Sequence, residues 1–478
     1  MNVAIHLFGR DLRVTDHLGL QCAAGIGEVL PVLVIDRRRA ARLARSPRRA
    51  AFFCAAVAAL ERAIRARGGR LVVRRGELGA TVRALARAAG ASAVVWAAAY
   101  DGEGLRADLQ LRHELEEYGL RAVVVHDAPA VSPEEIERRE GGGYRVFTAY
   151  LQAWSAARVE PTGGTVRFAP TELQSEPLPE PPEFDARIPT TDVRQIEGVE
   201  ERFARYLNGD ALGYLDAMRT PALDATTHLG PHLSFGTISA RAVVRAIRDR
   251  LADPFLLAEE RLSLRALLRS LAMRDFLLQL SWYNPESAVR PLQEQMADFP
   301  FARDHPALDA WREGSTGYPL VDAGIRQLRE TGWMHPLVRR VAASFLCFDL
   351  GVDWRIGLDE WDCRLIEDEP ALATGNWQWI AGVGADVVQF PRIFNPERQR
   401  RRYDPSGTYV RRWIPNLADV APRRASDDRQ LALPILSTTG YPPPVVDHER
   451  EARAFLARYH AHRMRSSSQS LISGTRTS

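Results

Sequence analysis

Two kinds of hydrophobic pattern divide this chain. Up to about residue 128, short apolar, β-branched runs alternate with longer segments in which apolar residues recur every three or four positions. The expected strands are Val3–Phe8, Val29–Ile35, Leu71–Arg74, Ala93–Trp96 and Ala122–His126, and the helices between them are expected at 48–67, 79–89 and 104–118. This alternation predicts an α/β domain with a parallel, doubly wound sheet, whose ligands would lie beyond the carboxyl ends of the strands.

The rest of the chain is mostly helical in pattern. Apolar residues repeat with helical spacing in 238–251, 257–281, 321–331, 337–350 and 447–463. Before these segments, prolines scattered over 161–189 prevent a continuous helix. We therefore predict an α/β domain at 1–128, a linker at 129–195, a large all-helical domain at 196–465 and a disordered tail at 466–478.

Composition narrows the classes of function only slightly. A hydrophobic fraction of 46% with 26% charged residues is ordinary for a soluble globular protein. The net charge of +3 is close to neutral, so any affinity for nucleic acid has to come from a local patch. The sequence contains no lysine, and all 63 basic residues are arginines. This excludes a Schiff-base lysine and a P-loop lysine.

Cysteine usage and hydropathy indicate a cytoplasmic protein. Cys22, Cys54, Cys347 and Cys363 show neither CxxC nor zinc-ligand spacing, so we expect no metal site and no disulfide framework. Arg10 interrupts the first apolar run, which argues against a signal peptide. No apolar run reaches the ~18 residues that a membrane span needs.

The densest chemistry lies between residues 316 and 396. Five of the ten tryptophans fall between Trp333 and Trp379, among ionisable residues in helical segments. A second notable segment begins at Thr226 and Thr227, where adjacent hydroxyls precede a helix start. Threonine hydroxyls and N-terminal helix amides both donate hydrogen bonds to phosphate, although an ordinary capping turn would have the same pattern.

Taken together, these phrases resemble the photolyase/cryptochrome flavoprotein family along essentially the whole chain. The opening Leu7-Phe8-Gly9-Arg10-Asp11-Leu12-Arg13-Val14-Thr15-Asp16 is similar to that family's "WFRRDLRxxDN" phrase, with departures at Leu7, Gly9 and His17. The second half matches, in order, through TGYPLVDAGIRQL, TGWMH, DWR, NWQW and RIFNP, which lie between residues 316 and 396. The resemblance implies an N-terminal domain able to hold an antenna chromophore of folate or deazaflavin type and a helical domain that binds FAD.

The resemblance also assigns cofactor positions. It implies that the pyrophosphate is held by Tyr214, Thr226, Thr227, His228, Leu229 and Gly230. Trp333 would line the flavin pocket, and Arg339 would pair with Asp349 near the isoalloxazine ring. The other implied cofactor contacts are Glu367 and Glu369, where the family usually has Asp, and Ala373, where it usually has an Asn facing flavin N5.

Electron transfer in this family runs through a chain of tryptophans. Trp377 and Trp354 match its first two members. The position of the third falls in Phe299-Pro300-Phe301, and phenylalanine is much harder to oxidise than tryptophan. The sequence therefore predicts a tryptophan chain that lacks its usual outermost member.

The lesion pocket departs most from the family. Ser270 and Met273 replace the Glu and Trp of its "NELIWREF" phrase, and Pro336 replaces the Asn that contacts lesion and adenine. The other expected pocket residues are Arg274, Arg340 and Trp379, and DNA phosphates would be contacted by Arg392 and Arg398. Losing an aromatic platform costs roughly 1–3 kcal/mol per base, so we expect weakened binding of a pyrimidine dimer.

Three functions are compatible with this sequence. The first is light-driven repair of pyrimidine dimers in damaged DNA by reduced FAD. The second is a cryptochrome-like blue-light receptor without repair activity, which the altered pocket favours. The third is an FAD enzyme acting on a small, anionic substrate in the former lesion cavity, beside Arg340.

Overall fold

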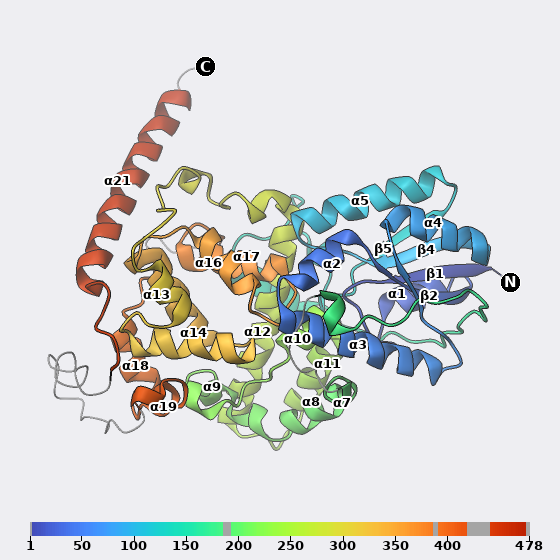
Figure 1. Cartoon of the computed structure of the whole chain (residues 1–478), viewed down its shortest axis with the longest axis horizontal. Coiled ribbons are helices and arrows are strands. Elements are labelled where there is room, and N and C mark those ends of the chain that lie inside the picture. The colour runs from blue at the N-terminus through green and yellow to red at the C-terminus, as the bar shows by residue number, and fades with distance from the viewer. Residues whose placement is uncertain (1, 185–192, 386–390, 418–439, 475–478) are drawn as a thin grey trace. The chain divides into compact units, whose positions relative to one another are not determined.

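The computed structural model describes residues 2–184, 193–385, 391–417 and 440–474 (Figure 1). Parts of the predicted linker (185–192) and tail (475–478) lie outside the described residues. The chain divides into two compact units. Unit 1 comprises Met1–Tyr214, Thr227–Glu286 and Leu365–Leu372, and unit 2 comprises Leu215–Thr226, Ser287–Arg364 and Ala373–Ser478.

The described part of unit 1 contains a five-stranded parallel sheet. Its strands are β1 (Val3–Phe8), β2 (Glu28–Ile35), β3 (Val72–Arg75), β4 (Ala91–Ala97) and β5 (Arg121–Val125). Their order is β3-β2-β1-β4-β5, and every pair is parallel, with Val3 opposite Glu28 and Phe8 opposite Leu33 in the β1–β2 pair. All five strands fall where the hydrophobic pattern predicts them. The chain winds outward in both directions from β1, so the switch point of the sheet lies between β1 and β4.

Helices cover both faces of this sheet, which confirms the doubly wound prediction. Alternate residues of β1 point to opposite faces. Ala4 and Phe8 pack into a core with α1 (Leu18–Ala24) and α3 (Pro47–Arg65). Ile5 and Leu7 pack into a second core with α4 (Leu78–Ala89) and α5 (Gly102–Glu117). Figure 1 shows α4 and α5 on one side of the sheet and α3 on the other.

The remaining helices of unit 1 bring the predicted cofactor loop next to the long helix α12. They are α2 (Arg37–Ala44), η1 (Pro133–Ile136), α6 (Phe147–Ala156), η2 (Pro181–Phe184), α7 (Val193–Glu197), α8 (Val199–Leu207), η3 (Asp210–Gly213), α10 (Gly230–Ser234), α11 (Ala240–Leu251) and α12 (Ala258–Tyr283).

The predicted linker is partly ordered against the sheet, because Val29 N–H donates to the Arg167 carbonyl and Ala169 N–H donates to the Val29 carbonyl. It also contains helix α6.

In the described residues of unit 2, all elements longer than an isolated bridge are helices. Its elements are η4 (Pro221–Leu223), η6 (Glu294–Met296), α13 (Leu308–Glu313), α14 (Pro319–Thr331), α15 (Pro336–Ser344), the π-helical turn η7 (Phe345–Asp349), α16 (Trp354–Asp362), α18 (Pro396–Tyr403), α19 (Thr408–Trp413), η8 (Pro415–Leu417) and α21 (His448–Gly474). Three further helices, α9 (Tyr214–Ala217), η5 (Pro285–Ala288) and α17 (Pro370–Ala381), begin in unit 1 and end in unit 2. This all-helical architecture agrees with the sequence prediction.

A buried carboxylate fixes the turn before α14. Asp322 accepts hydrogen bonds from the backbone N–H groups of Thr316 (2.8 Å) and Gly317 (3.1 Å) and from the Tyr441 hydroxyl. Gly317 has a φ of 79°, and a Cβ there would lie 2.3 Å from the Pro443 carbonyl oxygen. The TGYP phrase therefore has a structural reason as well as a family resemblance.

The structure differs from the sequence prediction at the C-terminal end. Helix α21 continues to Gly474 and so includes residues 466–474, which we expected to be disordered. Once a helix has begun, each added residue gains one hydrogen bond, so a polar Ser/Gln segment can extend it. Across the described residues, every helix is too short or too polar to span a bilayer. The four cysteines are all free thiols.

Candidate functional site

In unit 1 the loop Thr227–Gly230 has the geometry of a backbone cradle. The Thr227 hydroxyl accepts a hydrogen bond from Leu229 N–H (3.3 Å), and His228 has a φ of 50°, which is uncommon for a residue other than glycine. Gly230 begins α10, and a Cβ there would lie 2.7 Å from the Glu367 carboxylate. The fold therefore brings together Glu367 and the loop, which are far apart in sequence and were both predicted to contact the cofactor.

Tyr214, a predicted cofactor contact, also lies within hydrogen-bond distance of Ser270, a predicted lesion-pocket residue on α12. The Tyr214 hydroxyl lies 3.2 Å from Ser270 Oγ, and Ser270 donates in turn to the Ala266 carbonyl (3.1 Å). Ser270 is exposed and Met273, one turn further along the helix, is half-buried. Both side chains are short or flexible, so α12 presents no flat aromatic surface at these two positions.

Arg274 differs from the prediction that it lines the substrate pocket. Its guanidinium is buried and donates to the carbonyls of Ala128 (2.8 Å) and Leu233 (3.3 Å), and it pairs with Asp275 (3.4 Å). Carbonyls at these distances occupy the donors that a phosphate would need. Arg274 therefore acts as a structural link between the loop after β5 and α12.

A buried charge cluster surrounds Asp368, a residue that the sequence reasoning did not single out. Its carboxylate pairs with Arg42, with Arg10 (3.7 Å) and with Arg49 (3.9 Å), and Arg10 also pairs with Glu369 (3.1 Å). Burial alone would raise the pKa of Asp368, but the three arginines lower it. Glu369, predicted as a cofactor ligand, is anchored to Arg10, and burial raises its pKa. We call these five residues the Asp368 cluster.

A small pocket lies at the switch point of the sheet. It is lined by Leu7 to Arg10, at the end of β1, and by Trp96 to Asp101, at the end of β4, together with Glu369. This is where an open parallel sheet binds ligands. The volume of the pocket is about 120 Å³, below the ~300–1,000 Å³ of typical ligand sites. A tricyclic antenna chromophore does not fit unless side chains such as Arg10 or Arg39 move.

In unit 2 the predicted pair of Arg339 and Asp349 is not formed, and this prediction was wrong. Asp349 pairs with His448 at the start of α21, and Arg339 Nε donates to the Met334 carbonyl (2.8 Å). An α-helix turns by about 100° per residue, so ten residues already place two side chains on different sides. The π-helical turn η7 ends at Asp349 and changes its direction further.

Asp349 nevertheless fits a position beside a polar cofactor. Its Oδ2 atom is buried and has no hydrogen-bond donor among the described residues. Burial raises its pKa to about 6 despite the hydrogen bond with His448.

Trp333, the other residue predicted to line the flavin pocket, packs edge-on against His335, with ring centroids 6.2 Å apart. Pro336 starts α15, for which the His335 side chain serves as the N-cap.

Helix α16 carries an aromatic stripe that the sequence reasoning found only in part. Trp354, Gly357 and Trp361 are spaced three and four residues apart and share one helix face. The Trp377 ring packs on Gly357, where a Cβ would lie 2.2 Å from it. Its centroid is 4.6 Å from that of Trp361, which stacks on Trp311 at 6.2 Å and 13°. Trp377, Trp361 and Trp311, all buried, thus form a contiguous chain.

Trp354 is buried one turn before Gly357 on the same stripe. It has no ring contact with another tryptophan among the described residues, and the guanidinium of Arg355 lies 4.6 Å from its ring. The position of the usual outermost tryptophan is filled by a phenyl cluster: Phe299 contacts Phe301 (4.7 Å) and Phe455 of α21 (5.4 Å). The spacing of Trp354 and Trp361 on α16 was visible in the sequence, whereas the contact with Trp311 was not.

The arginines of α18 differ in their partners. Arg400 and Arg401 both pair with Glu397. Arg398 is exposed and pairs with no carboxylate among the described residues. Arg392 is also exposed, and its guanidinium lies over the Trp379 ring at 5.5 Å. Arg392 and Arg398 therefore keep their donors available, as contacts with phosphate require.

Comparison with known proteins identifies the class to which this fold and these sites belong. Residues 267–461 match the model of the FAD binding domain of DNA photolyase, and residues 4–181 match the model named DNA photolyase. A deoxyribodipyrimidine photo-lyase of Streptomyces griseus is 36% identical over 463 residues, which cover 95% of this chain and 98% of the relative. The chain belongs to the DNA photolyase family, and its helical part is an FAD-binding domain.

Solved structures agree with this assignment. A bacterial class III photolyase from Agrobacterium tumefaciens superimposes with a TM-score of 0.84 at 29% identity, covering 97% of this chain and 98% of that one. An archaeal photolyase from Sulfolobus tokodaii, described with two FAD molecules and a novel light-harvesting cofactor, gives a TM-score of 0.80 at 28% identity over 96% of this chain and 100% of that one. The resemblance stated from the sequence motifs is confirmed.

Proposed function

We propose that this protein is an FAD-dependent photolyase that uses blue light to repair pyrimidine dimers in DNA, with a weakened lesion pocket. The observation that carries the proposal is the match with a deoxyribodipyrimidine photo-lyase over 95% of the chain. When bound and reduced, FAD supplies the light-driven electron. The residues of this chain bind and orient the cofactor, hold the DNA and conduct electrons.

The proposed cofactor contacts follow from the geometry of each unit. In unit 1, the loop Thr227–Gly230 and Tyr214 hold the pyrophosphate, and Glu367 buttresses the loop from behind Gly230. In unit 2, Thr226, Trp333, Arg339 and Ala373 contribute as the family resemblance implies. Asp349 presents its unpartnered Oδ2 to a donor of the cofactor rather than to Arg339.

We propose that electrons reach the flavin through Trp377, Trp361 and Trp311. These three rings are in contact, whereas Trp354 makes no ring contact with another aromatic side chain among the described residues. Trp361 Nε1 is buried and has no hydrogen-bond acceptor among the described residues, but Trp311 Nε1 donates to the Ala342 carbonyl (2.9 Å). That acceptor stabilises positive charge on Trp311, so an oxidised tryptophan is favoured there.

The lesion pocket is the weak part of the machinery. Flipping a dimer out of the duplex costs a few kcal/mol, which stacking inside the pocket has to offset. Ser270 and Met273 provide no such stacking surface. Arg392 and Arg398 are the proposed phosphate contacts, and they add affinity without selecting the lesion. The expected result is repair with poor discrimination between damaged and intact DNA.

The decisive experiment is a repair assay with flavin-loaded, chemically reduced protein. An oligonucleotide with one cyclobutane pyrimidine dimer is incubated in blue light and in the dark. Chemical reduction bypasses the tryptophans, so the result reports on the pocket and the flavin alone. We expect light-dependent loss of the dimer. The variant Met273→Trp should bind the damaged oligonucleotide about 5- to 160-fold more tightly, the equivalent of ~1–3 kcal/mol of restored stacking.

A second tryptophan substitution, outside the proposed pocket, serves as the control. Leu223→Trp adds an aromatic ring at an exposed position and should leave affinity for the dimer unchanged. If neither the native protein nor Met273→Trp repairs the dimer in light, the repair proposal is wrong. A cryptochrome-like receptor, which the substitutions at Ser270, Met273 and Pro336 favour, would then be the better account.

A further inference from the structure

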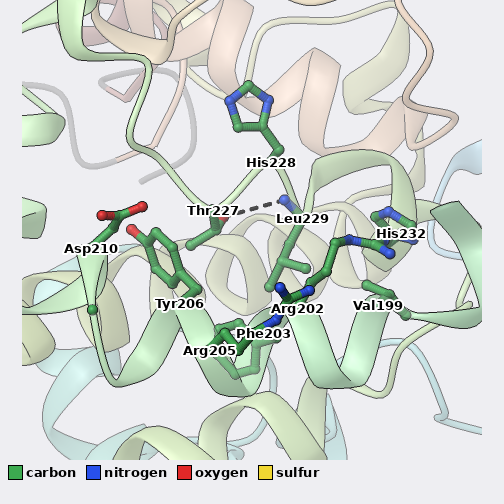
Figure 2. A pocket seen from close by; sticks show the side chains of 11 residues that line it. Val199, Arg202, Phe203, Arg205, Tyr206, Asp210, Thr227, His228, Leu229 and His232 are labelled. Atoms are coloured by element: carbon green, nitrogen blue, oxygen red, sulfur yellow. Dashed lines mark hydrogen bonds between the residues drawn. The ribbon is translucent and has the colours of Figure 1, made fainter.

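A second cavity lies in unit 1 on the side of the cofactor loop that faces α8. Its volume is about 440 Å³, within the ~300–1,000 Å³ of typical ligand sites. The walls come from α8, from the turn at Gly209 and Asp210, and from Thr227 to Leu229 together with His232 of α10. Figure 2 shows Asp210 and Tyr206 at one end of this α8 cavity and His232 at the other, with Thr227 between them.

The charge lining the α8 cavity is mainly positive. Arg202 and Arg205 both line it from α8, and neither pairs with a carboxylate among the described residues. The guanidinium of Arg202 donates to the Gln195 carbonyl, and burial together with the neighbouring Arg205 lowers its pKa. Asp210 is the only carboxylate among the residues described as lining the cavity. Two arginines three residues apart on one helix face repel each other, and an anion between them removes the repulsion.

Neutral groups complete the site. His232 Nδ1 is hydrogen-bonded to the Thr237 hydroxyl (2.8 Å), so Nε2 is left as the ring's other polar atom. Burial and the nearby Arg202 lower the pKa of His232 to about 4, so its ring is uncharged at neutral pH. Tyr206 is half-buried and stacks on Phe203, with centroids 6.4 Å apart and an angle of 20° between the rings. Its ring gives the cavity a flat aromatic wall.

We propose that the α8 cavity binds a nucleoside monophosphate, separately from FAD. The phosphate would be held by Arg202 and Arg205 in the forked geometry that guanidinium groups favour. The base would lie along Tyr206, and the carboxylate of Asp210 would accept from the ribose hydroxyls. The site shares Thr227, His228 and Leu229 with the proposed flavin contacts, so titration of the FAD-loaded chain decides whether both ligands are bound at once. The inference goes beyond the proposed repair function.

Equilibrium binding of AMP to the FAD-loaded full chain tests this. AMP, adenosine and inorganic phosphate are each titrated by calorimetry, and flavin absorbance confirms that FAD stays bound. We expect AMP to bind at least tenfold more tightly than either adenosine or phosphate alone. Arg202→Gln should weaken AMP binding at least tenfold without changing the flavin content. The matched control Arg112→Gln, at an exposed position on α5, should leave AMP binding unchanged.

Several outcomes would overturn the proposal. Equal affinity for phosphate and AMP would reduce the cavity to a simple anion site. Binding of AMP to flavin-free protein that disappears on loading with FAD would show that the cavity is part of the flavin site. An unchanged affinity in both Arg202→Gln and Tyr206→Leu would place AMP elsewhere. Failure of the repair assay leaves this test unaffected, because AMP binding is measured without light or DNA.

Discussion

Two regions of the molecule differ in the kind of side chain that they bury: one buries charged groups and the other buries aromatic rings. The Asp368 cluster of unit 1 buries charge, and its arginines come from β1's end, α2 and α3. The aromatic stripe of α16 in unit 2 buries rings and leaves two indole N–H groups without acceptors among the described residues. Removing one partner from a buried ion pair leaves uncompensated charge. Exchanging one ring for another leaves the fold nearly intact, so the stripe can change its electronic properties at little cost in stability.

The largest expected effect is on stability in unit 1. Asp368→Ala leaves Arg42, Arg10 and Arg49 without their shared carboxylate and should lower the free energy of unfolding by about 3–5 kcal/mol. Urea unfolding followed by circular dichroism measures the change. Asp309→Ala removes an exposed ion pair with Arg312 and should cost less than about 1 kcal/mol. Similar losses of unfolding free energy in the two variants would show that the Asp368 cluster contributes no more to stability than an exposed ion pair.

The next effect concerns pH. Burial raises the pKa of Asp349 to about 6 in the folded protein, compared with ~3.9 in an unfolded chain. The folded state therefore binds more protons between these values, and the stability associated with protonated Asp349 is lost as pH rises from about 4 to 6. Two pH units correspond to about 3 kcal/mol. Flavin-free native protein should lose that much more stability than Asp349→Asn between pH 4 and pH 7. Parallel pH profiles would show that Asp349 does not titrate in this window.

A smaller effect is expected at the centre of the stripe. A Cβ at Gly357 would lie 2.2 Å from the Trp377 ring and 2.5 Å from Leu346. Gly357→Ala should therefore destabilise the protein by about 1–3 kcal/mol, even though alanine favours helices. Gly213→Ala, with nothing within 4 Å of the added methyl group, is the matched control. Thermal unfolding monitored by tryptophan fluorescence compares them, and a stabilised Gly357→Ala would mean that the Trp377 ring is loosely packed.

The smallest expected effect, on the rate of flavin reduction, distinguishes electron transfer through Trp361 from electron transfer through Trp354. Trp361→Phe keeps an aromatic ring beside Trp377 but replaces the oxidisable indole between Trp377 and Trp311 with a phenyl ring that is much harder to oxidise. It should slow light-driven reduction of bound flavin about tenfold, or about 1.4 kcal/mol in barrier. Trp354→Phe should have a clearly smaller effect, and Trp377→Phe should stop reduction by both routes. Transient absorption of the oxidised tryptophan provides a second readout. A larger effect of Trp354→Phe than of Trp361→Phe would restore the predicted pair of Trp377 and Trp354 as the electron route.

The sequence predicted local structure and motif-based chemistry well. Short apolar, β-branched runs located every strand of the described sheet, and helical spacing located the long helices, because both patterns depend on neighbouring residues. The sequence motifs around Thr226, Trp333 and Trp377 are sufficient by themselves to indicate the family and its FAD-binding domain. These features are written in short stretches of sequence, so they can be interpreted without knowing how the chain returns on itself.

Only the tertiary structure decided which distant side chains meet. Asp349 turned to His448 because a π-helical turn changed its direction, and no spacing rule predicted that turn. Asp368, rather than the predicted cofactor contacts Glu367 and Glu369 beside it, pairs with three arginines that lie more than 300 residues away in the sequence. Trp311 reached Trp361 through the packing of α13 and α16. The sequence by itself determined the strands of the described sheet, the long helices, the family and the cofactor. The partners of buried charges and rings depend on long-range packing, which residues far apart in sequence specify together.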